Sequence, residues 1–261
     1  MTVFFHEMKR SKTALLIWSG AIAFMLAITI IIYPQMAPQM SEMEDMLANM
    51  GSFSDAFGMS QMSFGRFTDY FAIECGNVLG LGGAIFAAIT GVSMLSKEER
   101  GHTAEFLFTH PLSRGRIVLE KLLALVAQVA ALNLIVAGVS AACIALIGEE
   151  TDAYVLFLLF LAYFLLSLDI SLLCFGISAF LKNGLGVGLG IAIGMYFLNL
   201  LTNITEDAKF LKYITPYAFT EGGEILQNRA LSPEYVLIGM GLAAAAVAAA
   251  FIKYRSKDLA T

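Results

Sequence analysis

Residues 14–33 read ALLIWSGAIAFMLAITIIIY, twenty consecutive residues without a charge. An α-helix needs about 20 apolar residues to cross the hydrocarbon core of a bilayer. Ten of the twenty are Leu, Ile or Phe. Each of these favours insertion by ~0.3–0.6 kcal/mol, so the stretch favours insertion by roughly 3–6 kcal/mol. The stretch therefore predicts a membrane-spanning helix.

The same pattern recurs along the chain. Five further apolar stretches are long enough to span a bilayer, at residues 71–95, 122–147, 154–181, 184–201 and 235–252. Only 14% of the residues are charged, whereas soluble domains carry about 25%. We therefore expect an all-α integral membrane protein whose six transmembrane helices form one domain over residues 1–261. The sequence contains no basic stripe that would indicate binding to nucleic acid.

The distribution of Lys and Arg predicts the orientation in the membrane. If the N-terminus is cytoplasmic, twelve of the sixteen Lys and Arg residues fall on the cytoplasmic side and four on the far side. Short cytoplasmic loops carry an excess of Lys and Arg. Both termini are therefore expected in the cytoplasm, and residues 34–70 and 202–234 form the extracytoplasmic loops.

Residues 2–13 are expected to form a short interfacial helix, with Phe4, Phe5 and Met8 on its apolar face and charged side chains opposite. In the loop at 34–70, a methionine-rich helical face should lie on the bundle or the bilayer. The loop at 202–234 is expected to fold into short helices that dip back toward the membrane.

Residues 96–121, between the second and third spans, read SKEERGHTAEFLFTHPLSRGRIVLEK, the densest charged block of the chain. Thr103 can cap the start of a helix, and Pro111 cannot continue it, which predicts a helix of about two turns over residues 104–110. Its apolar side chains lie on more than one face. The segment either closes the bundle at the interface or presents a surface to a soluble partner.

This run resembles the segment of type-2 ABC exporter permeases that contains acidic residues, Gly-Thr-x-Glu-x-Leu, Pro-x-Ser-Arg and a final Lys. The order of spans and loops is similar over nearly the whole chain. The resemblance implies that the segment is a coupling helix, which docks on a separate ATPase subunit. The docking residues that it implies, together with two apolar residues of the same helix, are Glu98, Glu99, Gly101, Thr103, Glu105, Phe106, Leu107, Pro111, Ser113 and Arg114.

The resemblance implies a permease subunit of an ATP-driven exporter in a prokaryotic plasma (inner) membrane, paired with a second permease copy or paralogue. The chain contains no Gly-x-x-x-x-Gly-Lys-Ser/Thr loop, so we expect no enzymatic activity and no cofactor in this chain. ATP and Mg²⁺ would bind to the partner ATPase. The alternatives are an intramembrane hydrolase, which needs clustered catalytic groups at membrane depth, and a secondary transporter, which needs paired broken helices.

Two acidic residues lie within the expected spans. Asp169 is near the middle of the fourth span, where a carboxylate costs about 2.5–3.5 kcal/mol, so it should face protein or water. It is either a pathway or gating residue or an acid hydrogen-bonded to a neighbouring helix. Glu74 is a second pathway candidate, although it lies close enough to the outer end of its span to reach water.

The fifth span is rich in glycine. Gly186, Gly190 and Gly194 are four residues apart, and Gly184 and Gly188 are offset from them. Small residues at this spacing predict close packing between helices.

Overall fold

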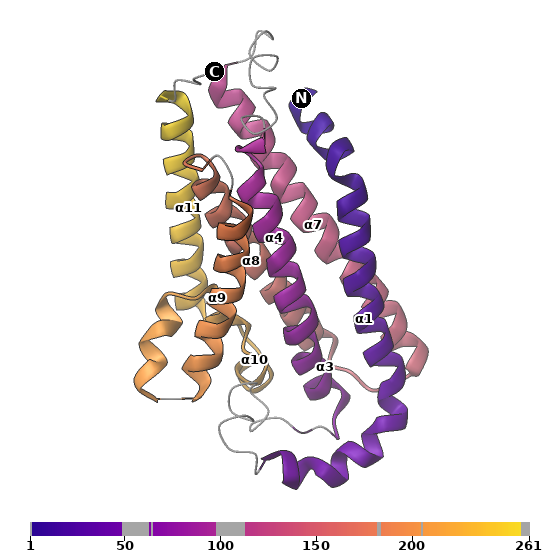
Figure 1. Ribbon diagram of the computed structural model, residues 1–261. Coiled ribbons are helices and arrows are strands. Elements are labelled where there is room, and N and C mark those ends of the chain that lie inside the picture. Colours follow the sequence, from indigo (N-terminus) through magenta and orange to yellow (C-terminus); the bar gives the residue numbers. More distant parts are fainter. Residues whose placement is uncertain are drawn as a thin grey trace.

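The computed structural model describes residues 2–48, 63, 65–97, 113–181, 184–204 and 206–256. Every regular element in these residues is helical (Figure 1). Six helices are long and apolar enough to cross a membrane, and each overlaps one of the six stretches found in the sequence. They are Thr2–Gln39, Phe67–Ser93, Arg114–Ile147, Ala153–Ser178, Leu185–Ile204 and Pro233–Tyr254. The expected all-α membrane fold is confirmed.

The first element, α1, is one continuous helix over Thr2–Ala48. The interfacial helix expected over residues 2–13 is therefore not a separate element. No Gly or Pro interrupts residues 2–19, and Glu7, which we expected on a solvated face, is buried inside the bundle. Both features favour continuing the helix directly into the span.

The helix α1 also continues into the region expected as a loop at residues 34–70 and passes through Pro34 and Pro38. A proline inside a helix removes one backbone donor and bends the helix. Figure 1 shows α1 changing direction near its lower end. The two prolines thus bend α1 without ending it.

The second span consists of three consecutive helices. These are α3 (Phe67–Cys75), the π-helix η2 (Gly76–Gly80) and α4 (Leu81–Ser93). π-Helical turns are rare, and they alter the usual pairing of backbone groups. The hydroxyl of Tyr217 donates a hydrogen bond to the carbonyl oxygen of Gly80 at 3.3 Å, at the end of this π-helix.

The bundle is organised around α8 (Ala153–Ser178), which packs against α4, α7 (Arg114–Ile147) and α11 (Pro233–Ser256). The helix α1 packs along α7, and α9 (Leu185–Ile204) packs against α4. In Figure 1, α1 begins and α11 ends at the same end of the bundle. The three cysteines, Cys75, Cys143 and Cys174, are buried free thiols, as expected for apolar spans.

The loop before the last span forms short helices, as expected. They are η3 (Glu206–Tyr213), η4 (Pro216–Thr220) and α10 (Gly222–Asn228). All five residues of η4 are buried, and η4 contacts α8, α9 and α11. The hydroxyl of Tyr163 on α8 donates to the carbonyl oxygen of Thr220 at 3.2 Å, which fixes the end of η4 in the bundle.

Candidate functional site

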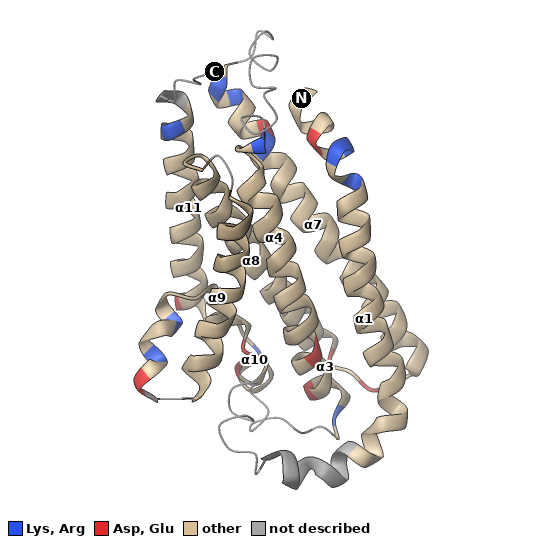
Figure 2. Ribbon diagram, in the orientation of Figure 1, with Lys and Arg blue, Asp and Glu red and all other residues tan. Residues whose placement is uncertain are grey.

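The candidate site lies at the end of the bundle where α1 begins and α11 ends, because the expected docking segment starts and finishes there. Figure 2 shows positions of Lys and Arg, in blue, at that end on α1, α7 and α11. Residues 98–112 lie outside the described residues, and Lys97 and Ser113 flank them. The site can therefore be built from the helix ends on either side of this segment.

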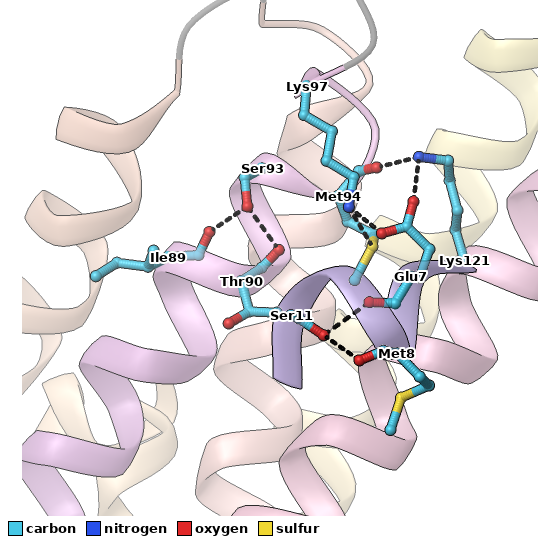
Figure 3. A network of polar contacts seen from close by, with 9 residues as sticks. All are labelled: Glu7, Met8, Ser11, Ile89, Thr90, Ser93, Met94, Lys97 and Lys121. Atoms are coloured by element: carbon cyan, nitrogen blue, oxygen red, sulfur yellow. Dashed lines mark hydrogen bonds and ion pairs between the residues drawn. The ribbon is translucent and has the colours of Figure 1, made fainter. Parts of the chain in front are cut away.

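A buried polar network, formed by Glu7, Met94, Lys97 and Lys121, joins three parts of the chain at this end (Figure 3). The ammonium of Lys121 lies 3.2 Å from Oε1 of Glu7 and donates to the carbonyl oxygen of Met94 at 2.7 Å. Lys97 forms an ion pair with Oε2 of the same carboxylate. Glu7 belongs to α1, Met94 and Lys97 follow α4, and Lys121 belongs to α7. One carboxylate thus connects all three.

The network is shielded from solvent. Glu7 is 1% exposed and Lys121 is 0% exposed. Two buried charges are tolerated when they pair and when hydrogen bonds satisfy their remaining atoms, which both carboxylate oxygens and the Lys121 ammonium achieve here. Removing one partner of such a pair costs about 3–5 kcal/mol because the other charge stays buried without compensation. Breaking the contact between Glu7 and Lys121 therefore costs a substantial part of the folding free energy.

The residue before Lys121 holds the beginning of α1. Oε2 of Glu120 accepts hydrogen bonds from the backbone N–H groups of Val3 at 3.0 Å and Phe4 at 3.3 Å. Its other oxygen, Oε1, lies 3.1 Å from Nε of Arg116. The first N–H groups of a helix have no partner within the helix, and a carboxylate there also interacts favourably with the helix dipole. Adjacent residues of α7 thus anchor α1 at two levels.

The structure places two of the predicted docking residues. Ser113 caps α7, with its side chain accepting from the backbone N–H of Arg116 at 3.4 Å, and Arg114 is the first residue of that helix. The other predicted docking residues lie outside the described residues. They are Glu98, Glu99, Gly101, Thr103, Glu105, Phe106, Leu107 and Pro111.

Asp169 lies in the contact between α8 and α11 of the same chain. It is 0% exposed, and a Cβ placed on Gly239 of α11 would overlap its Oδ2 atom. Neither carboxylate oxygen has a hydrogen-bond partner among the described residues. Of the two expected environments, protein and water, Asp169 therefore faces protein. The neighbouring helix α11 supplies no hydrogen bond to it. An unpaired buried polar group is costly, so this residue is a candidate for a role beyond packing.

Glu74 lies at the end of α3, two residues before Gly76, where the π-helix η2 begins, and it is partly buried. The side chain of Tyr196 on α9 donates to Oδ1 of Asn77 in η2 at 3.4 Å. Glu74 therefore lies beside the π-helix η2 in the second span, whereas Asp169 belongs to α8. The structure does not bring the two acids together in one described contact.

The two sets of glycines on α9 have different surroundings. A Cβ on Gly188 would lie 2.8 Å from Val92 and 3.1 Å from the carbonyl oxygen of Ala88, so this face packs closely on α4. Nothing lies within 4 Å of a Cβ on the other set, which comprises Gly186, Gly190 and Gly194. Within the described residues of one chain, only the first set makes the close contact that the spacing predicts.

The opposite end of the bundle carries cations that are paired with acids. Arg66 lies 2.8 Å from Asp69, and Arg229 lies 2.7 Å from Asp152. Lys212 pairs with Glu221 at 3.0 Å and with Glu224 at 3.1 Å. Burial raises the pKa of the Glu221 carboxyl above its ordinary value, an effect that the Lys212 ammonium opposes. These positive charges are therefore largely neutralised locally.

The buried network was not found by sequence reasoning. The resemblance ran as far as Lys121 without giving it a role, and Glu7 was expected on a solvated helix face. The two residues are 114 positions apart, and a single Glu and a single Lys give no periodic signal. Only the packing of α1 along α7 brings them together.

Taken together, six helices that are long and apolar enough to cross a membrane, with charged residues near their ends, define a multi-pass membrane protein. The chain belongs to a known family of transport proteins: the family described as ABC-2 family transporter protein matches residues 1–259. It is thus a membrane permease of an ABC transporter, and this family is a membrane component and not a nucleotide-binding domain. A search of curated proteins found no match.

Proposed function

We propose that this chain is the permease subunit of an ATP-driven exporter and that separate ATPase subunits dock at residues 96–121. The observation that carries the proposal is the buried network of Glu7, Met94, Lys97 and Lys121, in a chain that matches the family over residues 1–259. A docking segment can move the bundle only if its ends are held firmly. The network holds both the chain that enters this segment and the helix that leaves it.

ATP and Mg²⁺ bind to the partner subunit in this proposal, because the permease sequence has no phosphate-binding loop. The permease converts closure of the ATPase into a rearrangement of its spans. ATPase subunits are the typical partners of this family, which supports the assignment.

Co-expression with the ATPase encoded nearest to this gene tests the docking site. Charge reversal at Glu98, Glu99 or Glu105 should abolish co-purification of the ATPase. The matched control is Glu149→Lys, which reverses an acid at the opposite end of the bundle and should leave assembly unchanged. Normal assembly of all three docking variants would refute the assignment.

We place both termini in the cytoplasm. The excess of Lys and Arg at that end supports this orientation, as does the local pairing of cations with acids at the other end. Labelling of intact cells with a membrane-impermeant maleimide tests it through two exposed positions. Asp207→Cys should be labelled in intact cells, and Lys253→Cys only after permeabilisation. The reverse pattern would invert the orientation.

We further propose that a second permease copy or paralogue packs on the open glycine face of α9. Support comes from Gly186, Gly190 and Gly194, which leave this face free of side-chain contacts within 4 Å, since small residues let membrane helices approach closely. A cysteine at Gly190 should form a cross-linked dimer in membranes. Leu134→Cys, an exposed position on α7, is the control and should not. Equal cross-linking at both positions would contradict the proposed interface.

Asp169 and Glu74 stay predictions as pathway or gating residues. Asp169→Asn keeps the shape of the side chain and removes its charge. If Asp169 acts in the transport cycle, this variant should assemble with the ATPase and retain its thermal stability, while the ATP hydrolysis rate of the complex changes. Unchanged stability and unchanged hydrolysis would leave Asp169 as a packing residue.

A further inference from the structure

We propose that Glu7 is a positioning residue that makes α1 move together with the docking segment. The inference rests on the proposed function, because it assumes that an ATPase acts on residues 96–121. It goes further by naming the helix that receives the movement and the side chain that transmits it.

The geometry divides one carboxylate between the two sides of the docking segment. Oε2 of Glu7 pairs with Lys97, the last described residue before residues 98–112, and Oε1 pairs with Lys121 near the start of α7 (Figure 3). Lys121 also donates to the carbonyl oxygen of Met94, directly after α4. A displacement of either end of the segment therefore reaches Glu7 through a direct charged contact.

The burial of this contact makes it a firm link. Exposed ion pairs are weak because water competes for both partners, whereas Glu7 and Lys121 are 1% and 0% exposed. Water cannot replace either partner without entry into the bundle. The two helices are thus held in a fixed register at this point.

A second anchor acts on the same helix. Glu120 accepts from the backbone N–H groups of Val3 and Phe4, so α1 is held at its first turn and again at Glu7. Farther along, the buried residues of α1 are mainly apolar, as at Leu26 and Ile30. Apolar packing is non-directional, so it resists sliding less than charged contacts do. The first turns of α1, which hold both anchors, are therefore the part of the helix that a movement of the docking segment displaces most directly.

The inference can be tested by the movement of α1 in the assembled complex of permease and ATPase in lipid nanodiscs. Spin labels at Leu16→Cys on α1 and Leu237→Cys on α11, both exposed positions, report the distance between these helices. In the unaltered background the distance should differ between the ADP state and the ATP–vanadate state. Glu7→Gln should reduce this nucleotide-dependent change to less than half in complexes that still co-purify with the ATPase, although its thermal stability should be lower, because Lys121 then stays buried without a charged partner. Glu7→Asp, which keeps the charge, should restore at least part of it.

The matched control is Asp69→Asn. Asp69 is a buried carboxylate, 2% exposed, paired with Arg66 at the opposite end of the bundle. A loss that only reflected the removal of the charge of a buried carboxylate would appear in both variants, whereas the proposal expects the change to persist in Asp69→Asn.

Each outcome decides a different point. A full nucleotide-dependent change in Glu7→Gln overturns the inference and leaves the proposed function intact, as does a complex in which α1 does not move at all. Failure of the unaltered permease to bind any ATPase overturns the proposed function itself. If Glu7→Gln does not fold, Lys97→Met gives the same test, because Lys97 is the more exposed cation of the link, with 13% of its side chain accessible, and its removal leaves the pair of Glu7 and Lys121 in place. It should also reduce the change, and a full change in that variant would overturn the inference.

Discussion

Replacing Gly239 with Ala should destabilise the permease through its contact with Asp169. A methyl group there would overlap Oδ2 of Asp169 and lie 3.3 Å from its Cγ, closer than the ~3.5–4.0 Å optimum for two carbon atoms. Overpacking of this kind costs about 1–3 kcal/mol. Since 1 kcal/mol corresponds to about 2–4 °C in a chain of this size, the melting temperature should fall by roughly 2–12 °C.

Thermal unfolding in detergent, followed by loss of the monodisperse peak on size exclusion, measures this fall. In an Asp169→Ala background the same Gly239→Ala change should cost nothing, because the added methyl occupies space that the carboxylate has left. Such coupling between contacting residues is typically about 0.5–3 kcal/mol. Gly138→Ala on α7 is the control, since nothing lies within 4 Å of its Cβ, and it should be neutral or slightly stabilising. An equal penalty with and without Asp169 would refute the contact.

Three further variants extend the test. Gly91→Ala should be strongly destabilising in the same unfolding assay, because its Cβ would overlap the backbone carbonyl of Ser171, which no rotamer change can relieve; a melting temperature equal to the parent would contradict the packing of α4 on α8. Arg229→Ala should cost less than about 1 kcal/mol, since its ion pair with Asp152 is partly exposed, and a larger loss would show a structural role there. Ser113→Ala should cost about 1 kcal/mol through loss of the α7 cap and, as one of the predicted docking residues, should also weaken ATPase co-purification; unchanged co-purification at reduced stability would leave Ser113 as a helix cap alone.

The spans could be predicted from the sequence because the bilayer imposes a length and a composition on each of them. The third span shows this well: the expected and observed helices both end at Ile147. The helix itself begins earlier than the expected span at residues 122–147, at Arg114. The added turns contain Arg116, Glu120 and Lys121, which raise local polarity, and Ser113 caps the start of the helix.

The course of α1 was harder to predict. Charged residues near the N-terminus indicated an amphipathic surface helix, yet Glu7 is neutralised by lysines from distant parts of the chain. The loop expected over residues 34–70 implied that the helix ends before Pro34, whereas α1 continues through it. The local sequence indicates whether a side chain favours water, but it does not indicate which side chain of another helix will pair with it.

The environment of Asp169 was predicted in part. The seven-residue spacing of Ala162, Asp169 and Gly176 predicts that they lie near one closely packed face of α8, and Gly176 does pack against Ala246 of α11. The seven-residue spacing was sufficient for that prediction. That no hydrogen bond reaches Asp169 depends on Gly239, which sits opposite the carboxylate with no side chain of its own. Such a pairing across two helices leaves no trace in the spacing along either one.

The pairing of Glu7 with Lys121 also has a consequence for how the protein is made. These residues are separated by 114 positions, and translation adds about 5–20 residues per second. Lys121 is therefore synthesised roughly 6–23 s after Glu7. During that time α1 can enter the bilayer but cannot complete its packing. The first span made thus reaches its final position only after the third span has been synthesised, and nascent chains that stop before α7 should leave α1 loosely held at the insertion machinery.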